Sequence, residues 1–208
     1  MPAADIAVGG FSSLSTCDWP GELVATVFCQ GCPFACRYCH NSDLILPGPG
    51  AGPDFGSILA LLDKRRGLLD GVVFSGGEPT LQKALPEAVA AVRALGFRVG
   101  LHTAGPYPER LARLLPLVDW VGFDVKAPFS DYHRVTGVPG SGEHAKASLL
   151  ALVESGVATD IRTTVHAALL RNDDLARLDG ELSSLGLGPT RRQPFRAEGC
   201  RDAELLAG

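Results

Sequence analysis

Short apolar segments alternate with segments of helical spacing along most of the chain, and this alternation constrains the fold more than any other feature. Helices are expected at residues 82–95, 107–115, 143–155 and 172–185, and one more is expected to follow its capping residue Asp54. Strands are expected between them, at residues 23–29, 71–74, 97–101, 118–123, 160–165 and near 190–195. Such alternation predicts an α/β fold in which helical crossovers join parallel strands, either as a doubly wound sheet or as an incomplete (β/α) barrel.

Polar and glycine-rich motifs follow nearly all of the expected strands. The carboxyl ends of parallel strands share one edge of the sheet, and ligands of α/β proteins bind there. The sequence therefore predicts an enzyme whose site is assembled along this edge. The motifs are a cysteine-rich loop at residues 30–41, Ser75–Pro79, His102–Gly105, Asp124–Lys126 and His166.

Three cysteines of the loop, Cys32, Cys36 and Cys39, have the spacing C-x3-C-x2-C. Thiolates bind iron, and three of them on one loop can hold three corners of a [4Fe–4S] cube, which leaves one iron open to a ligand. Cys29 is also near, and four thiolates can form a structural zinc site or a closed electron-transfer cluster. Alternation along residues 23–29 instead favours Cys29 as a small core residue. Zinc, a closed cluster and free thiols remain alternatives at this point.

Length and composition indicate one domain of 208 residues with a net charge of −4, which argues against a protein that coats nucleic acid. We expect an N-terminal cover segment at residues 1–22, a partial barrel at 23–195 and a C-terminal tail at 196–208. Clustered cysteines suit a reducing compartment. The N-terminus lacks the basic and apolar parts of a signal peptide, and the apolar runs are too short to span a membrane. A cytoplasmic protein is therefore expected.

The cysteine spacing, with Tyr38 before the third cysteine, resembles the radical S-adenosylmethionine (SAM) superfamily. The resemblance implies an incomplete (β/α)6 barrel of the radical SAM type and a [4Fe–4S] cluster on Cys32, Cys36 and Cys39. In that superfamily the open iron chelates the amino and carboxyl groups of SAM. These three cysteines are thus the expected metal ligands and catalytic residues.

The other motifs resemble the branch of this superfamily that activates glycyl radical enzymes. In radical SAM proteins a Gly-Gly-Glu-Pro element binds the methionine amino group. In the activase branch an Asp-x-Lys segment serves SAM, and a histidine ends a later strand beside the SAM ribose or adenine. Two departures are that His102–Gly105 stands where many relatives have Thr-Asn-Gly, and that Cys17 replaces an aliphatic residue. The resemblance implies SAM contacts, or support of them, from Tyr38, His40, Gly76, Gly77, Glu78, Thr103, Asp124, Lys126 and His166.

The chain as a whole resembles the anaerobic ribonucleoside-triphosphate reductase activating proteins, relatives of pyruvate formate-lyase activating enzyme. This implies that a flavodoxin- or ferredoxin-type donor reduces the cluster and that SAM is cleaved reductively. The resulting radical would abstract hydrogen from a glycine of a partner, most naturally anaerobic ribonucleotide reductase. One alternative is a radical SAM enzyme acting on a small molecule or a nucleobase. Another is a zinc- or cluster-binding module without catalysis. The sequence assigns no role to Cys17 or Cys200.

Overall fold

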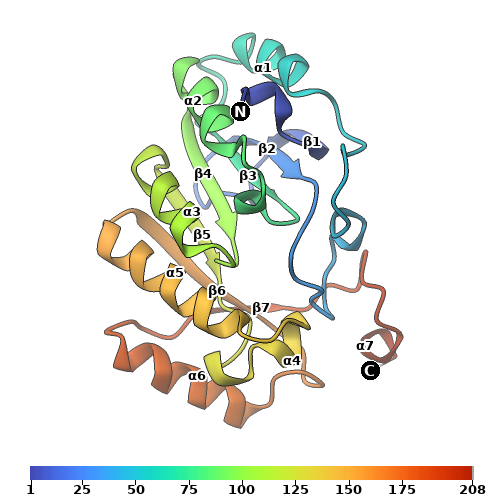
Figure 1. The fold of residues 1–208 in the computed structure, drawn as a ribbon, viewed down its shortest axis with the longest axis vertical. Coiled ribbons are helices and arrows are strands. Elements are labelled where there is room, and N and C mark those ends of the chain that lie inside the picture. Colours follow the sequence, from blue (N-terminus) through green and yellow to red (C-terminus); the bar gives the residue numbers. More distant parts are fainter. Residues whose placement is uncertain (208) are drawn as a thin grey trace.

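The computed structural model describes residues 1–207, and seven strands of this part form a single sheet in sequential order (Figure 1). The first strand runs antiparallel to the second, and each later pair is parallel. A doubly wound sheet reverses its strand order at a switch point, and this order does not. The strands are β1 (Val8–Ser15), β2 (Val24–Cys29), β3 (Gly71–Gly76), β4 (Arg98–Thr103), β5 (Trp120–Asp124), β6 (Ala158–Val165) and β7 (Arg191–Pro194).

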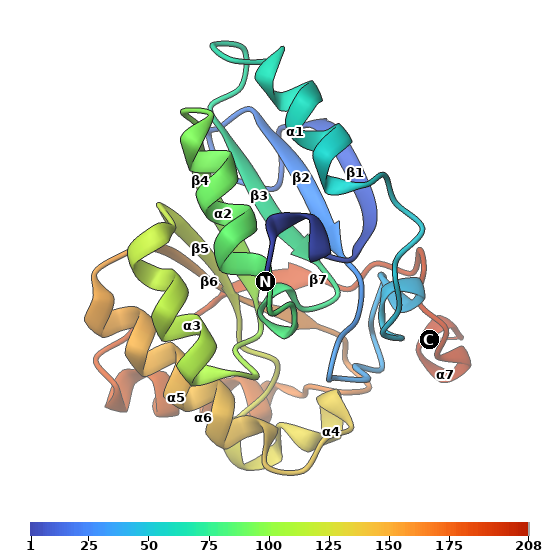
Figure 2. The ribbon, with the colours of Figure 1, turned by 45° about the horizontal axis from the view of Figure 1, so that its top comes forward.

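The sheet curves through its successive strands (Figures 1 and 2), and within residues 1–207 β7 does not pair with β1. The architecture is therefore an incomplete barrel, which confirms the second of the two expected sheets. Short 3₁₀ turns lie at Ala3–Asp5, Ser42–Leu44, Pro79–Leu81, Leu115–Leu117 and Phe129–Asp131. The helices are α1 (Phe55–Asp63), α2 (Leu85–Ala94), α3 (Pro108–Leu114), α4 (His133–Thr136), α5 (Ser141–Ser155), α6 (Asn172–Ser184) and α7 (Ala203–Leu206).

Helix α1 begins where the sequence predicts it, because the Asp54 carboxylate accepts a hydrogen bond from the Ser57 backbone N–H at 2.9 Å. The other long helices match their expected positions with ends shifted by up to three residues. No helix in the described part of the chain combines the length and apolar character needed to cross a membrane.

The two faces of the sheet bury different side chains. The outer face packs against the helices and forms the main core, in which Cys29 is fully buried. The expected core position of Cys29 is therefore confirmed. The inner face carries a smaller apolar cluster at the amino ends of the strands, where the rings of Trp19 and Trp120 stack 5.4 Å apart. We call this cluster the plug; its residues are Trp19, Val24, Val73 and Trp120.

The N-terminal segment differs in part from the expectation. The N-terminal cover segment expected at residues 1–22 contains the strand Val8–Ser15, which pairs antiparallel with β2 and extends the sheet. The alternation along residues 23–29 predicts Leu23 on the same core face as Cys29, but Leu23 is 45% exposed because β2 begins only at Val24. The division of the chain into cover, barrel and tail remains a prediction.

Candidate active site

The cysteine-rich loop leaves the carboxyl end of β2 and is held by backbone hydrogen bonds from two directions. The Cys32 N–H donates to the Ile45 carbonyl, and the Ala35 N–H donates to the carbonyl of Thr136 in α4, both at 2.9 Å. The three cysteines predicted to bind iron are free thiols and only partly buried. A fixed loop therefore presents three thiols at the edge where the sequence predicts the site.

The surroundings of these thiols keep them protonated when no metal is bound. Burial, and next the charge of Glu78, raise the pKa of Cys32 to about 12. Burial raises the pKa of Cys36 to about 11, against the opposing effect of the Lys126 charge. Metal binding must displace these protons. Among residues 1–207, no three His, Cys, Asp or Glu side chains converge as the ligands of one metal ion do. The cysteine ligands of a cube each bind a different iron.

The Gly-Gly turn after β3 presses against the backbone of the cysteine-rich loop. The N–H of Gly77 donates to the Cys29 carbonyl, and the N–H of Glu78 donates to the Gly31 carbonyl, each at 2.9 Å. A Cβ on Gly76 would lie 2.5 Å from the Cys29 nitrogen, and one on Gly77 would lie 2.3 Å from the Gly31 oxygen. Gly76 also has φ +105°, which disfavours any side chain. The contact between turn and loop therefore itself requires both glycines.

Glu78 points into the protein and not along the rim. Its side chain accepts four hydrogen bonds, from the N–H and hydroxyl of Thr80, the hydroxyl of Thr103 and the N–H of Ala104, at 2.6–3.0 Å. The residue is only 2% exposed, and burial raises the pKa of its carboxyl although these donors oppose the shift. The side chains of Glu78 and Thr103, both predicted to contact SAM, thus bind each other. The Glu78 backbone is engaged as well, because its carbonyl accepts from the Leu81 N–H at 3.0 Å, and a contact of Glu78 with SAM remains a prediction.

Asp124 ends β5, and its side chain forms an ion pair with Lys126, two residues further on. The Lys126 ammonium lies 3.1 Å from one Asp124 oxygen, and the Arg162 guanidinium lies 2.9 Å from the other. Burial would raise the pKa of Asp124, but the charges of Lys126 and Arg162 hold it well below its usual range. Lys126 also lies 5.6 Å from the centre of the Tyr38 ring. The ion pair is therefore ionised and adjoins the cysteine-rich loop.

Arg162, which belongs to none of the rim motifs, and His102, the first residue of the His102–Gly105 motif, extend this network across the inner face. The His102 ring lies 3.0 Å from the Ser75 hydroxyl and 2.7 Å from the Asp18 carbonyl. Burial and the charge of Arg162 lower the pKa of His102 to about 4, so the ring is neutral at pH 7. Because a carbonyl only accepts, we assign the proton to Nε2, and Nδ1 then accepts from Ser75. The ring edge rests on Trp120 of the plug.

One feature of the sequence could have marked Arg162 as a site residue: it is a charged residue inside an expected strand, three residues before the end of that strand. Parallel pairing places Arg162 of β6 directly opposite Asp124 of β5. A positive charge within a half-buried strand requires a partner, and this one is 8% exposed. The pattern identified the strand but not the partner, because local periodicity carries no information on the register of parallel strands.

Tyr38 carries the one buried side-chain nitrogen or oxygen atom of residues 1–207 that has no hydrogen-bond partner, its hydroxyl. The residue is 5% exposed and lies between Cys36 and Cys39 in the sequence. A buried hydroxyl without a partner costs about 1–3 kcal/mol. This hydroxyl lies in the region of the thiols and Lys126, where a bound group could supply the missing hydrogen-bond acceptor.

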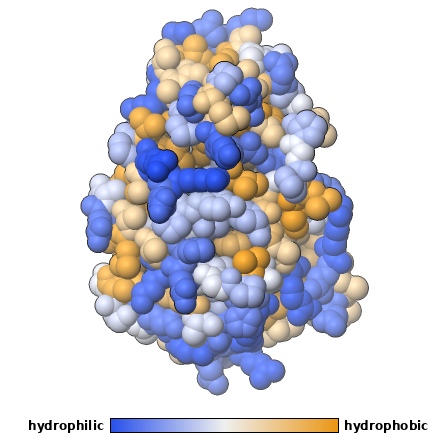
Figure 3. Space-filling model, in the orientation of Figure 1, coloured by the Kyte–Doolittle hydropathy of each residue, from blue (hydrophilic) through white to orange (hydrophobic). Residues whose placement is uncertain are grey.

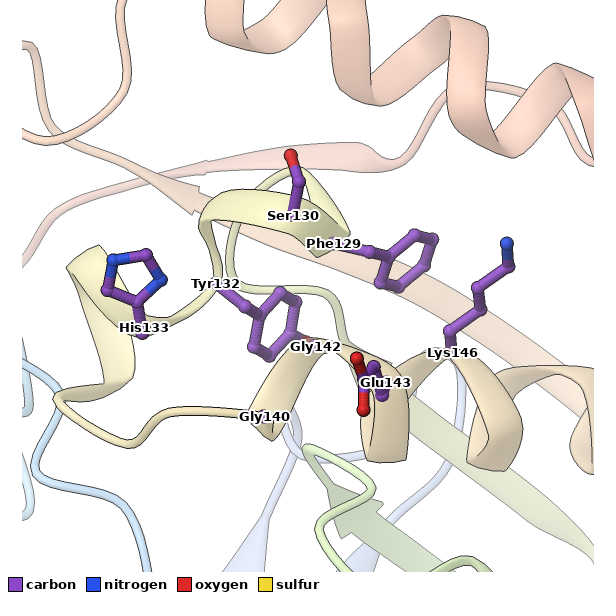
Figure 4. A pocket seen from close by; sticks show the side chains of 8 residues that line it. All are labelled: Phe129, Ser130, Tyr132, His133, Gly140, Gly142, Glu143 and Lys146. Atoms are coloured by element: carbon purple, nitrogen blue, oxygen red, sulfur yellow. The ribbon is translucent and has the colours of Figure 1, made fainter.

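Tyr132 links the Asp124–Lys126 segment to α4. Its hydroxyl donates to the Asp124 carbonyl at 3.2 Å and accepts from the Lys126 N–H at 3.0 Å. The ring borders a separate pocket of about 280 Å³ between the 3₁₀ turn Phe129–Asp131 and α5 (Figure 4). None of the predicted site residues lines this pocket, whose lining is Phe129, Ser130, Tyr132, His133, Gly140, Gly142, Glu143 and Lys146.

The two predicted histidines stand apart from this network. His166 directly follows β6. Its ring edge packs on the Phe195 ring, 4.9 Å between ring centres, and its Nδ1 accepts from the Ala168 N–H at 3.2 Å. His40 is exposed, and its carbonyl lies directly against Gly199 of the tail. Among the described residues, neither histidine side chain shares a hydrogen bond or ion pair with another predicted site residue. Their contacts with SAM remain predictions.

The C-terminal tail covers the outer side of the cysteine-rich loop. The Arg37 guanidinium pairs with Asp202 at 2.5 Å and with Glu204 at 2.7 Å. The thiol of Cys200, which is buried, donates to the Arg37 carbonyl at 3.4 Å. The structure thus gives Cys200 a contact at the loop that carries the three predicted ligands.

Comparison with known proteins identifies the family. The radical SAM superfamily model matches residues 26–178. A putative glycyl-radical enzyme activating enzyme from Methanocaldococcus jannaschii is 33% identical over 178 residues, 81% of this chain and 72% of the relative. The pyruvate formate-lyase-activating enzyme of Streptococcus mutans is 30% identical over 201 residues, 86% of this chain and 72% of the relative.

Solved structures share the fold at low sequence identity. QueE from Escherichia coli superposes with a TM-score of 0.55 at 16% identity, over 97% of this chain and 90% of that one. A structure of anSMEcpe with bound AdoMet gives a TM-score of 0.64 at 16% identity, over 80% of this chain, which spans 49% of that longer chain. The fold, the sequence match and the three thiols agree: this chain belongs to the radical SAM superfamily, whose enzymes use a [4Fe–4S] cluster and S-adenosylmethionine.

Proposed function

We propose that this enzyme generates a glycyl radical on a partner protein, and that the partner is an anaerobic ribonucleotide reductase. The observation that carries the activase proposal is the identity of at least 30% with two activating enzymes, over more than four fifths of this chain. The choice of ribonucleotide reductase rests on the resemblance of the motifs alone. We also propose a cytoplasmic location, because free clustered thiols suit a reducing compartment.

The residues present fit the two cofactors. We propose that Cys32, Cys36 and Cys39 hold the cluster, since they are free thiols on one fixed loop. The orphaned hydroxyl of Tyr38 supports the same conclusion, because a bound group at this place can accept its hydrogen bond. When bound, the reduced cluster and SAM together supply cleavage of the C5′–S bond and a 5′-deoxyadenosyl radical.

The neighbouring side chains have complementary tasks in this proposal. Lys126 offers its ammonium to the SAM carboxylate, and Asp124 offers a carboxylate to the SAM amino group. The Arg162 guanidinium fixes one oxygen of Asp124 at 2.9 Å, so it orients the carboxylate before any ligand arrives. No described residue donates to the carbonyl of Gly77, which leaves that oxygen available for an ammonium group.

A second candidate function is chemistry on a small molecule. The 7-carboxy-7-deazaguanine synthase of Methanopyrus kandleri is 32% identical over 128 residues, 52% of this chain and 51% of the relative. This match covers less of both chains than the activase matches do. We therefore rank the activase first.

The test is anaerobic reaction of the reconstituted enzyme with SAM, dithionite and a candidate glycyl radical enzyme. The expected result is a stable doublet in the electron paramagnetic resonance spectrum of the partner. Deuterium at the partner's glycine should appear in 5′-deoxyadenosine. Label that arrives instead from a free nucleotide or pterin, with turnover and no protein radical, would overturn the activase proposal and support the second candidate.

A further inference from the structure

A positively charged hollow lies between α2 and α3, outside the site described above. It encloses about 330 Å³, and its polar lining includes three cations and no acidic residue. Figure 3 shows strongly hydrophilic side chains gathered on this face where α2 and α3 approach each other in Figure 1. We call it the basic hollow; it is lined by Thr80, Gln82, Lys83, Pro86, Arg110, Arg113 and Leu114.

The charges of the basic hollow are not neutralised within the described chain. No carboxylate among residues 1–207 lies within ion-pair distance of Lys83, Arg110 or Arg113. Other side chains in this part of the protein, with the N-terminal amino group, form fifteen ion pairs. Lys83 and Arg113 are exposed. The whole chain carries a net charge of −4, so this concentration of positive charge runs against its average. It therefore attracts a negatively charged surface that the remainder of the protein repels.

Arg110 connects the basic hollow to the cysteine-rich loop. Its guanidinium donates to the carbonyls of Thr80 at 3.1 Å and Leu81 at 2.8 Å, and it stacks over the Tyr107 ring at 4.4 Å. The Leu81 side chain in turn lies against Gly31, where a Cβ would come within 2.7 Å of it. Gly31 directly precedes Cys32. A short run of contacts therefore joins the hollow to the first predicted iron ligand.

We propose that the basic hollow docks an acidic one-electron carrier protein, which reduces the cluster from this side. One electron passes from the reduced carrier to the oxidised cluster; the carrier is oxidised by one electron, and no bond forms or breaks. The proposal rests on the proposed radical SAM chemistry, which needs such an electron. Two exposed cations beside a fixed third give the long-range attraction and orientation that a transient redox encounter requires.

The test compares two double variants of the reconstituted enzyme. Lys83→Glu/Arg113→Glu reverses both exposed cations of the hollow. Lys64→Glu/Lys146→Glu reverses two exposed lysines that also have no described ion pair, and so makes the same change in net charge elsewhere. The probe is an acidic flavodoxin in its reduced form. Stopped-flow bleaching of the cluster gives the reduction rate, and calorimetry with the oxidised flavodoxin gives the dissociation constant, both at low and at high salt.

The hollow variant is expected to lose affinity and reduction rate on the order of tenfold at low salt, and the loss should shrink at high salt. The control variant should lose much less. Equal losses in both variants, or no loss in the hollow variant, would overturn the proposal. Saturable binding of inorganic phosphate in the hollow, without binding of flavodoxin, would also overturn it and would indicate a small-anion site.

Dithionite separates this proposal from the proposed function. It reduces the cluster without a docking protein, so the hollow variant with dithionite should still cleave SAM and form the partner radical at the unmodified rate. If the unmodified enzyme forms no partner radical with dithionite, the activase proposal is wrong. If the hollow variant forms the radical with dithionite but is reduced slowly by flavodoxin, the defect lies in docking of the carrier and the docking proposal is supported.

Discussion

Replacing Glu78 by glutamine is expected to destabilise the protein, because the Glu78 carboxylate is a structural acceptor. One oxygen accepts three hydrogen bonds, two from Thr80 and one from Thr103, and the other accepts from the Ala104 N–H at 3.0 Å. An amide can keep its carbonyl in only one of the two places. The least costly orientation retains the three bonds and turns an NH₂ group against the Ala104 N–H.

The size of the effect follows from these contacts. Leaving the Ala104 N–H without an acceptor costs about 2 kcal/mol, and the three retained bonds lose about 1 kcal/mol each with the negative charge. Burying a neutral amide in place of a charge returns about 2 kcal/mol. The net loss is about 3 kcal/mol in the free energy of unfolding. This corresponds to a fall of about 1 M in the urea midpoint for a chain of this size.

The assay is urea unfolding of the cofactor-free protein, followed by circular dichroism, for the unmodified chain and the variant. Glu87→Gln is the matched control, because Glu87 is exposed and pairs only with the N-terminal amino group, at 3.3 Å. The control should change the free energy of unfolding by less than about 0.5 kcal/mol. An unchanged midpoint for Glu78→Gln, together with lost SAM affinity in the reconstituted enzyme, would refute the reasoning and make the carboxylate a ligand contact.

Three other predictions follow from the site. In the reconstituted protein, Cys32→Ser should abolish the broad visible absorption of the cluster and Cys29→Ser should retain it, because Cys29 lies in the core; the opposite pattern would reverse the assignment. Tyr38→Phe should not lower the melting temperature of the cofactor-free protein, because the hydroxyl has no partner to lose; a clear fall would show that the hydroxyl is bonded. Burial would raise the pKa of Asp124, but the charge of Lys126 keeps this pKa below 3.8, the value in the unfolded chain. The ionised Asp124 therefore stabilises the folded protein above pH 3.8, and this contribution to the free energy of unfolding is lost as the pH falls further. Acid titration of Asp124→Asn should therefore show a shallower loss of stability than the unmodified chain, and equal slopes would contradict this.

The parts of the structure that could be predicted from the sequence are those governed by local periodicity. Cys29 could be placed in the core because a strand period of two groups it with apolar neighbours. The buried position of Glu78 could not be predicted, because a Gly-Gly-Glu turn has the same sequence whether its carboxylate faces a ligand or the protein interior. Its donors include the end of β4, about 25 positions away in the sequence. Strand β1 was also incompletely predicted, since a run rich in glycine and serine has little strand propensity.

The site network depends on pairings that only the assembled sheet creates. Asp124 and Arg162 meet because β5 and β6 pair in that register, and His102 reaches the Asp18 carbonyl from a different strand. Such contacts join residues 38 and 84 positions apart in the sequence. The motifs in the sequence therefore predicted which edge of the sheet carries the site. The residues that orient the side chains at this edge could be identified only from the three-dimensional structure.

The plug gives this protein an optical property that is independent of its cofactors. Both tryptophans of the chain are the stacked pair, each 6% exposed, with ring planes inclined by 17°. Intrinsic tryptophan emission therefore reports the amino ends of the strands and no other region. Two indoles so close together also couple their electronic transitions, so a paired signal is expected in the near-ultraviolet circular dichroism spectrum. Since Trp19 precedes β2 and Trp120 begins β5, that signal marks the moment when distant strands have closed upon each other during refolding.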